Sequence, residues 1–231
     1  NTNSAIWAPL SNNGDSITLS GNSASGNQLN GFVTAGTIAG SVTWDGDDGF
    51  PFLAWDDIVV NANASLTLTP GTIVKFHDYY DDLWVYGRLI ADTTANAPIY
   101  FTSVKDDGVG GDSNSDGSTT SPAPNDWSSL RFLDGSSGST LDNVVVRYAG
   151  GDWYESVYIQ TRSITFTNNL ITRSGENGLR LDNVLPASLT GNSFLTNTNS
   201  AIWVPLTNNG DSIVLSGNRA QGNQLNGFVT A

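Results

Sequence analysis

Three segments near the end of the chain decide the fold: FTNNLITRSGENGLRL (166–181), LTGNSFLTNTNSAIWV (189–204) and LSGNRAQGNQLNGFVT (215–230). Each begins with an apolar residue, has Asn three positions later, and has a small residue followed by a bulky apolar one nine positions after the Asn. These Asn residues are 23 and 26 positions apart, and a further Asn lies 26 positions earlier. The spacing predicts a structural column of four side chains: Asn143, Asn169, Asn192 and Asn218.

A similar period occurs upstream, where six apolar positions recur after 23 to 26 residues. Short runs rich in Val, Ile, Leu, Thr and aromatic residues alternate with period two and are interrupted by Gly, Asn, Asp or Pro, which is typical of β-strands. No helical period persists for ten residues. The six matches are Ile58 with Leu83, Val60 with Val85, Leu66 with Leu89, Leu68 with Ala91, Ile73 with Ile99, and Val74 with Tyr100.

Strands without helices at this period predict an all-β chain that coils as a parallel β-helix, or β-solenoid. At ~24 residues per turn, 196 residues make about eight turns, which rise roughly 38 Å at ~4.8 Å per step. An Asn at a turn can bond the turns above and below it, and it tolerates a left-handed backbone. We expect a right-handed coil, the usual hand of parallel crossovers. A Greek-key sandwich is the alternative, but it would not repeat matched columns at this period.

The two ends of the chain have nearly the same sequence. Residues 1–35 recur as residues 197–231, at an offset of 196, with five differences. The sequence therefore predicts a single continuous solenoid over 1–231, in which 1–196 is one unit and 197–231 begins the next. The alternative is an internal duplication at the ends of a finished domain. The differences are Ala8/Val204, Ser11/Thr207, Thr18/Val214, Ser23/Arg219 and Ser25/Gln221.

Composition excludes several classes of function. The chain has 22 acidic and 9 basic side chains, a net charge of −13, which argues against nucleic acid and anionic membranes as partners. It has no Cys and a single His, His77, which excludes disulfides, thiol catalysis and multi-histidine metal sites. No apolar window is long enough for a membrane span. The start, Asn1-Thr2-Asn3, suggests that targeting segments were removed or that this is a window of a longer chain.

Several strings resemble a known group of proteins. The Asn column, the Asn-Gly-apolar turns, SLTLTPGTIVKF (65–76), GRLIADTTANAPIYFTSVKDD (87–107) and APNDWSSLRF (123–132) are similar to bacterial extracellular right-handed parallel β-helix repeat proteins of the pectate-lyase-like superfold. The resemblance covers most of residues 36–231. It implies the fold and an extracellular or cell-surface location, but little about activity, because that fold hosts lyases, hydrolases, adhesins and passive stalks.

A candidate calcium loop lies in an inserted acidic segment, residues 104–126. Its core, Asp112-x-Asn114-x-Asp116-Gly117, spaces three oxygen ligands two residues apart, with Gly permitting the turn around one ion. The pattern resembles EF-hand-like and dockerin-like loops, but Ala123 stands where those loops have a bidentate Glu. A solvated polar loop is the alternative. The remaining charge would have to come from the other candidate ligands, Asp106, Asp107 and Asp126.

Two further acidic clusters, 45–48 and 78–82, are expected to be solvated turns, with a second calcium site or an exposed binding edge as the alternative. Aromatic residues on turns are candidates for stacking on sugars, and the candidate glycan contacts are Trp153, Tyr154, Tyr79 and Tyr80.

No catalytic residues are predicted. Paired carboxylates facing one groove, or a base beside a calcium cluster, would be needed to cleave polysaccharides, and the basic residues are scattered singly. His77 lies in Phe-His-Asp rather than the Gly-His-Gly of polygalacturonases of this fold.

We therefore expect an extracellular structural repeat protein that forms a calcium-stabilised solenoid filament or cell-surface stalk. Its predicted cofactor is Ca²⁺. Its predicted partner is itself, as tandem repeats or a head-to-tail polymer. A surface adhesin that binds glycans along its flank is the second hypothesis, and a polysaccharide lyase or hydrolase is the third.

Overall fold

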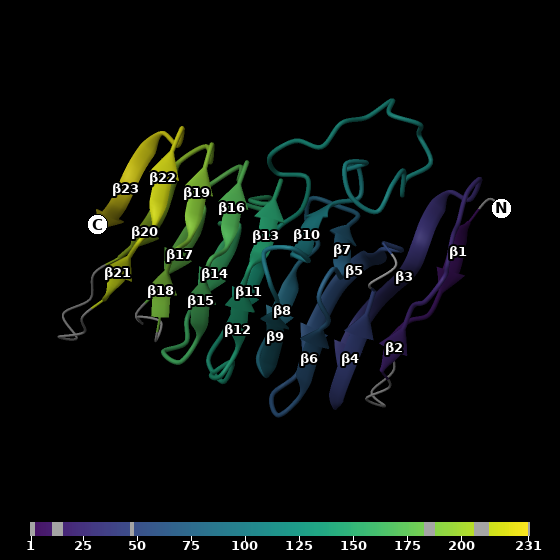
Figure 1. Ribbon diagram of the computed structural model, residues 1–231, viewed down its shortest axis with the longest axis horizontal. Helices are drawn as coiled ribbons and strands as arrows, with labels where there is room; N and C mark the ends of the chain where they lie inside the picture. The colour runs from purple at the N-terminus through teal and green to yellow at the C-terminus, as the bar shows by residue number, and fades with distance from the viewer. Residues whose placement is uncertain (1–2, 11–15, 47–48, 183–187, 206–212, 231) are drawn as a thin grey trace.

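The computed structural model describes residues 3–10, 16–46, 49–182, 188–205 and 213–230. All the regular elements among them are β-strands, and every strand pair is parallel. They form a 15-stranded and an 8-stranded sheet whose strands stack along one long axis (Figure 1). Since the smaller sheet contributes one strand to each turn, the predicted solenoid of about eight turns is confirmed.

The coil has three faces. The first face consists of β7 (Ile73–Phe76), β10 (Ile99–Ser103), β13 (Val144–Arg147), β16 (Leu170–Thr172), β19 (Ser193–Leu195) and β22 (Arg219–Gln221). The second consists of β8 (Leu83–Val85), β11 (Leu130–Phe132), β14 (Val157–Ile159), β17 (Leu179–Leu181), β20 (Ser200–Val204) and β23 (Leu225–Thr230). The third consists of β2 (Ile17–Thr18), β4 (Ser41–Asp45), β6 (Ser65–Leu68), β9 (Arg88–Asp92), β12 (Thr140–Asp142), β15 (Thr165–Thr167), β18 (Ser188–Thr190) and β21 (Leu215–Ser216).

Long strands join the first two faces near the N-terminal end. β5 (Phe52–Val60) pairs through 52–54 with β7 on the first face and through 58–60 with β8 on the second. β3 (Leu29–Ile38) pairs with β5 along its length and with β1 (Ser4–Trp7) on its other side. The two faces therefore form one 15-stranded sheet.

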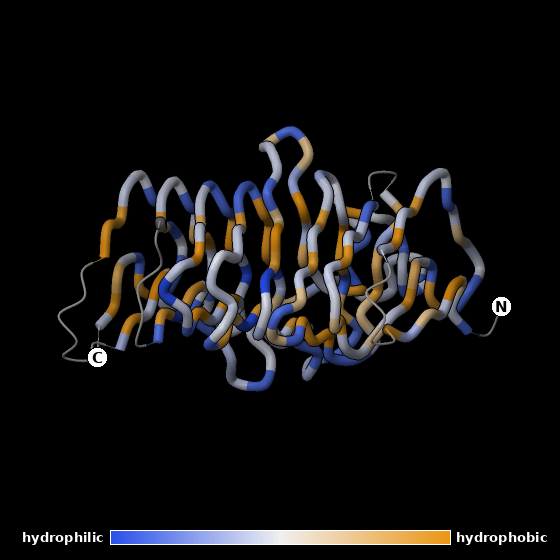
Figure 2. Tube along the Cα trace, turned by 90° about the horizontal axis from the view of Figure 1, so that it is seen from below, coloured by the Kyte–Doolittle hydropathy of each residue, from blue (hydrophilic) through white to orange (hydrophobic). Residues whose placement is uncertain are grey.

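The core is a set of columns that run along the axis. Side chains alternate inward and outward along each short strand, and inward positions stack on their equivalents one turn away. On the third face Leu141, Phe166 and Leu189 are consecutive in register and fully buried. Figure 2 shows hydrophobic positions recurring from turn to turn along the coil.

Four of the six upstream matches are confirmed by the strand pairs Ile58–Leu83, Val60–Val85, Leu66–Leu89 and Leu68–Ala91. The last two matches were wrong by one residue, because Ile73 pairs with Tyr100 and Val74 with Phe101. A shift of one residue exchanges inward and outward positions. The apolar pattern did not reveal it, since Ile73 and Ile99 are both apolar and the length of the turn before β10 is not encoded by hydrophobicity.

The two copies of the 35-residue segment pair their strands in the same register. Both copies also have a register shift at the same place in the strand pair. In the first copy the pairs are Ser4–Leu29, Ile6–Phe32 and Trp7–Val33; in the second they are Ser200–Leu225, Ile202–Phe228 and Trp203–Val229, each 196 positions later. The repeated sequence therefore encodes the same turn of the coil twice.

Candidate functional site

The inserted loop is the largest departure from the regular coil. It leaves β10 after Ser103, returns at Leu130 and stands out above the stacked strands (Figure 1). It folds back toward the N-terminal end, where Val104 joins Leu29, Val33 and Leu53 in a small second core. The loop therefore covers the outer face of β3 and β5.

A buried lysine, Lys75, binds this loop through hydrogen bonds. Lys75 on β7 has no exposed surface, and its Nζ donates to Asp106 O at 2.9 Å, Gly111 O at 2.8 Å and Ser113 Oγ at 2.7 Å. All three ammonium donors thus have acceptors. Burial lowers the pKa of Lys75 to about 8, and the negative charge of Asp106 opposes that shift. Sequence reasoning missed this residue, because a single Lys inside a strand gives no signal of its own.

Two of the six candidate calcium ligands form ion pairs instead of joining the acidic group. Asp106 is buried; it pairs with the Arg147 guanidinium and accepts a hydrogen bond from Thr102 Oγ1 at 2.6 Å. Asp126 accepts a hydrogen bond from Lys105 Nζ at 2.7 Å. Their carboxylates therefore fix the base of the loop.

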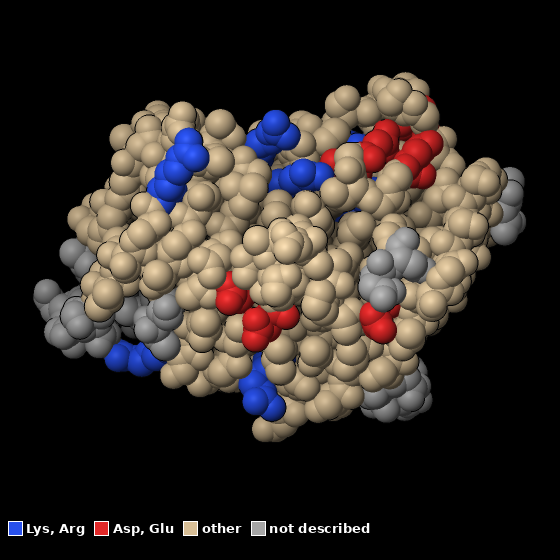
Figure 3. Space-filling view, in the orientation of Figure 1, with Lys and Arg blue, Asp and Glu red and all other residues tan. Residues whose placement is uncertain are grey.

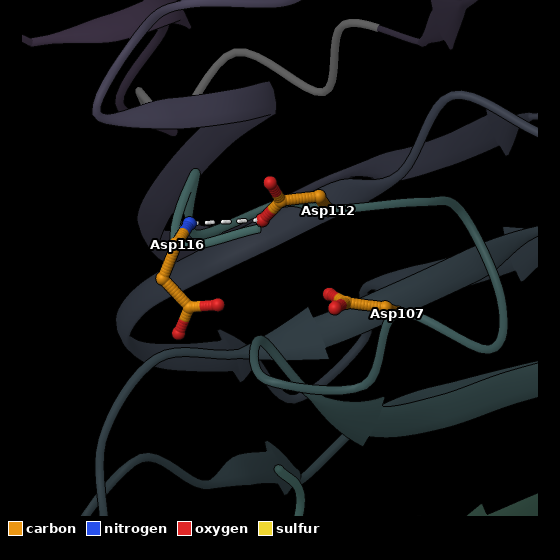
Figure 4. Close-up of side chains that lie close together, drawn as sticks. All are labelled: Asp107, Asp112 and Asp116. Atoms are coloured by element: carbon orange, nitrogen blue, oxygen red, sulfur yellow. Dashed lines mark hydrogen bonds between the residues drawn. The ribbon is translucent and has the colours of Figure 1, made fainter. Parts of the chain in front are cut away.

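The other acidic candidates lie together. Asp107, Asp112 and Asp116 each offer one carboxylate oxygen, and these oxygens all lie within 4.8 Å of one another (Figure 4). Asn114 Nδ2 donates to Asp116 Oδ2 at 2.8 Å, which places the fourth candidate beside them. In Figure 3 acidic side chains gather at the upper right in the region of this loop, with basic side chains beside them.

Hydrogen bonds within the loop shape the acidic group. Asp112 accepts from the backbone N–H of Asp116 at 3.1 Å and of Gly117 at 3.0 Å. Hydrogen bonds to Asp116, the largest from the Thr120 hydroxyl, lower the pKa of its carboxyl. The pKa of Asp107 is raised by burial and then by the charge of Asp112. The donors are all hard oxygen atoms, the type that Ca²⁺ prefers, so the residues present fit that ion.

The loop is also tied to the first copy of the repeated segment. Asn30 Nδ2 donates to Asp112 O at 3.0 Å and to Ser115 Oγ at 2.8 Å, and Asn30 N donates to Ser113 O at 2.8 Å. The acidic loop and the strand that begins the unit are therefore one structural assembly.

The Asn residues form a ladder along the axis, with one correction. Asn192 Oδ1 accepts from Asn169 N at 2.9 Å, and Asn218 Oδ1 accepts from Asn192 N at 2.9 Å. In the turn before, Asn169 Oδ1 accepts from Val144 N at 2.9 Å. Asn143 therefore lies one position before the ladder, at φ 56°, in a left-handed conformation shared with Asn168, Gly191 and Gly217. The 26-residue spacing misplaced Asn143 by one position, because that turn of the coil is one residue shorter than the spacing assumed.

A second Asn ladder was not predicted. Asn197 Oδ1 accepts from Ser174 N at 3.0 Å, and Asn223 Oδ1 accepts from Asn197 N at 2.9 Å. The signal was present in the sequence, because these two Asn residues are 26 positions apart, like the predicted pair Asn192 and Asn218.

The four candidate glycan contacts lie on two connecting loops that touch each other, one after β7 and one after β13. A β-carbon at Gly151 would lie 2.3 Å from Tyr79 O, so the turn after β13 touches the turn after β7. Trp153 is 83% exposed and Tyr80 is 65% exposed. The rings of Tyr79 and Tyr80 meet edge to face at 4.9 Å between centroids.

Tyr154 has a different environment, because its ring covers the Arg131 guanidinium at 3.7 Å. That contact belongs to a ladder of alternating arginine and aromatic side chains on the second face. Arg131 lies 4.1 Å from the Trp84 ring, and Arg180 lies 4.4 Å from the Trp203 ring. In register order the ladder is Trp84, Arg131, Tyr158, Arg180 and Trp203. The arginines, which look scattered in the sequence, are thus aligned by the coil.

Two carboxyl groups in the turn after β7 have strongly raised pKa values. Burial raises the pKa of Asp81 and of Asp82 to about 7, and their exposed fractions are 5% and 4%. Asp81 Oδ2 accepts from the backbone of His77 and Asp78, which makes it part of the turn. His77 packs its ring against Trp55, at 3.9 Å between centroids. The expectation that the acidic cluster 78–82 is a solvated turn was therefore wrong for Asp81 and Asp82, because both side chains are buried.

Comparison with known proteins gives no relative: no family model matches the chain, no curated protein matches it, and no solved structure matches it. Among the described residues there is no helix long and apolar enough to cross a membrane.

Proposed function

We propose that this chain is a structural module, one repeat of an elongated β-solenoid whose turns continue from unit to unit. One observation carries the proposal: the two copies of the 35-residue segment, 196 positions apart, form the same strand pairs with the same register shift. A sequence that returns to the same turn after a whole number of turns is able to repeat along the axis without a break.

The construction suits a mechanical role. Every turn hydrogen-bonds to the next through parallel strands, and the inward columns bury apolar side chains along the axis. The Asn ladders add side-chain hydrogen bonds in the same direction. We therefore propose a filament or stalk. An extracellular or cell-surface location is supported by the resemblance of the sequence strings to extracellular β-helix repeat proteins.

We also propose that the loop binds calcium. Supporting this, Asp107, Asp112 and Asp116 bring three carboxylate oxygens within 4.8 Å of one another. Asp107 Oδ1 and Asn114 Oδ1 on this loop are buried and have no hydrogen-bond partner among the described residues. A divalent ion would satisfy these acceptors and reduce the repulsion between the carboxylates.

Binding of surface glycans is a second candidate function. It is favoured by the contact between the loop after β7 and the loop after β13, which carry the candidate aromatic residues. Trp153 and Tyr80 are exposed there, and exposed aromatic rings stack on sugar rings. A glycan array tests it: binding that is lost in Trp153→Ala and Tyr80→Ala, but kept in Trp55→Ala, supports an adhesin. The absence of any glycan binding contradicts it.

The structural role is tested with a tandem chain in which residues 36–231 follow Ala231 a second time. Small-angle X-ray scattering should give a straight rod longer than the single chain by roughly 38 Å, eight turns at ~4.8 Å each. Two compact bodies joined by a flexible link would contradict the proposal.

A further inference from the structure

The two loops that carry the exposed aromatic rings are also acidic. Because β7 and β13 are parallel strands of one face, the loops that follow them leave at the same edge of the coil (Figure 1). Residues 77–82 and 149–156 contain five acidic side chains and no Lys or Arg. Trp153 and Tyr80 therefore lie among negative charges. The five acids are Asp78, Asp81, Asp82, Asp152 and Glu155.

The charges of the two loops act on each other. Burial is the main cause of the raised pKa values of Asp81 and Asp82; the charge of Asp78 adds to the rise at Asp81, and that of Asp152 adds to the rise at Asp82. Burial lowers the pKa of His77, so this side chain is uncharged near neutral pH. Since Asp152 and Asp82 belong to different loops, a cation at this edge is attracted by both loops.

Positive groups close to these loops are already engaged. Arg131 is 8% exposed, and an aromatic ring covers its guanidinium at 3.7 Å. Lys105 Nζ lies 2.7 Å from Asp126, and Arg180 lies 3.7 Å from Glu155. The surface formed by the two loops thus offers aromatic rings together with carboxylates, while the neighbouring cations are covered or held in ion pairs.

The backbone holds the most exposed ring in an unusual conformation. Asp152 has φ 48° and Trp153 has φ 62°, in the left-handed region that is unfavourable for a bulky side chain. Trp153 is 83% exposed, so burial of its ring within the chain does not offset this strain. Strained residues of this kind cluster at binding sites. The conformation of the loop therefore favours a ligand that covers the indole.

We propose that a patch consisting of Asp78, Tyr80, Asp152 and Trp153 binds glycans built from amino sugars whose amino groups are free and positively charged. The inference rests on glycan binding, the second candidate function, and names the class of sugar. A glucosamine unit matches both features of the patch: its apolar face stacks on the indole, and its ammonium group is attracted by the carboxylates and by the faces of the rings.

Other ligands match only one of these features. Neutral sugars use the rings alone, and acidic sugars are repelled by the carboxylates. A lysine-rich peptide uses the charges but has no sugar ring to stack on Trp153, which is 83% exposed. The combination of an exposed indole with surrounding acids therefore favours a cationic sugar.

The experiment is calorimetric titration of the full 231-residue chain with a glucosamine oligomer and with its N-acetylated counterpart of equal length. The pH is one at which the free amines are charged. We expect the glucosamine oligomer to bind roughly tenfold more tightly, because several weak charge contacts add up. Its affinity should fall with added salt, whereas that of the N-acetylated oligomer should not.

Two variants separate the charges from the ring. The double variant Asp78→Asn with Asp152→Asn should lose roughly the same tenfold for the glucosamine oligomer, lose the salt dependence, and bind the N-acetylated oligomer as before. Asn tolerates the left-handed backbone at position 152. Asp92→Asn, which removes an exposed acid on β9, is the control and should bind like wild type.

Trp153→Gly should abolish binding of both oligomers and keep the melting temperature, because the ring is exposed and Gly adopts the left-handed backbone without strain. A melting temperature that stays unchanged shows that the loss of binding does not come from unfolding.

Equal affinity for the two oligomers, or unchanged affinity in the double variant, would overturn the assignment to cationic sugars and leave glycan binding in place. An oligolysine of equal charge that binds as tightly as the glucosamine oligomer would assign the patch to basic peptides instead. If a glycan array shows binding to other sugars but not to glucosamine, only the class of sugar is wrong. If no glycan binds, the second candidate function fails as well.

Discussion

Asn30 Nδ2 donates a hydrogen bond to Ser115 Oγ at 2.8 Å, across 85 positions of sequence. This bond joins the strand that starts the unit to the acidic loop inserted near its middle. The same Asn recurs as Asn226 in the second copy of the segment. Asn226 is therefore a matched control for measuring how much the contact between Asn30 and the loop stabilises the chain.

The first prediction compares Asn30→Ala with Asn226→Ala. Both variants lose the bonds from the asparagine three positions earlier, but only Asn30→Ala also loses the bonds to Asp112 and Ser115. At about 1 kcal/mol for each hydrogen bond, Asn30→Ala should lower the free energy of unfolding by about 2 kcal/mol more than Asn226→Ala. Urea unfolding of the two variants measures the difference. Equal losses would mean that the loop contributes nothing at this contact.

The second prediction concerns the first Asn ladder. Asn192 is fully buried, and Asn192→Ala leaves Asn169 N and Phe166 O without their partners. The expected loss in the free energy of unfolding is about 3 kcal/mol. Asn168→Gly is the control, because Asn168 is exposed and already has a left-handed backbone, φ 56°. It should change stability by less than about 1 kcal/mol; a similar loss in both variants would contradict the role of the ladder.

The third prediction is a dependence of stability on pH. Burial raises the pKa of Asp81 and Asp82 from 3.8 to about 7 in the folded chain. Between these values the folded chain keeps protons that the unfolded chain releases, so the free energy of unfolding falls as pH rises and levels off above about 7. Melting temperatures across this range should fall less steeply in Asp82→Asn, which has one titrating group fewer. An unchanged slope in that variant would mean that the pH dependence of stability comes from the overall charge and not from Asp82.

The fourth prediction tests the ladder of arginine and aromatic side chains. Arg131 is stacked between the Trp84 and Tyr154 rings, at 4.1 and 3.7 Å. Arg131→Lys keeps the charge but loses the planar stacking, so the free energy of unfolding should fall by about 1 kcal/mol. Arg88→Lys, at an exposed position on β9, should change it by a few tenths at most. Guanidinium unfolding distinguishes the two, and equal effects would argue against stacking.

The fifth prediction is the effect of removing metal. If the loop holds calcium, EDTA should lower the melting temperature by several degrees, and restored Ca²⁺ should reverse the change. The double variant Asp112→Asn with Asp116→Asn should not respond to either addition. Asp92→Asn, an exposed acid on β9, should respond like wild type. A melting temperature that EDTA leaves unchanged in wild type would contradict the calcium site.

The fold could be predicted because its information is repeated. The apolar pattern repeats from one turn to the next, after about 24 residues. Leu66, Leu89 and their equivalents therefore specify the same inward column several times. What the period does not contain is the length of each turn. For that reason Ile99 and Asn143 were each placed one residue out of register, although both belong to the turns in which they were expected.

The candidate site was less predictable, since it depends on one loop that occurs once. The Asp-x-Asn-x-Asp spacing correctly grouped Asp112, Asn114 and Asp116. It did not show that Asp106 and Asp126 pair with cations, because Arg147 and Lys105 reach them only in the folded coil. Nor did it indicate that the buried Lys75 holds the loop, since that contact depends on how the loop folds back over β7.

The central claim is that one unit continues into the next without a break in register. A cryo-electron microscopy structure of the tandem chain tests it most directly. We predict that Phe228 pairs with the second-unit equivalent of Phe52, as Phe32 pairs with Phe52 here, and that the second acidic loop covers Asn226. A tandem structure in which β23 stays uncovered, with the units joined only by a flexible linker, would contradict the account.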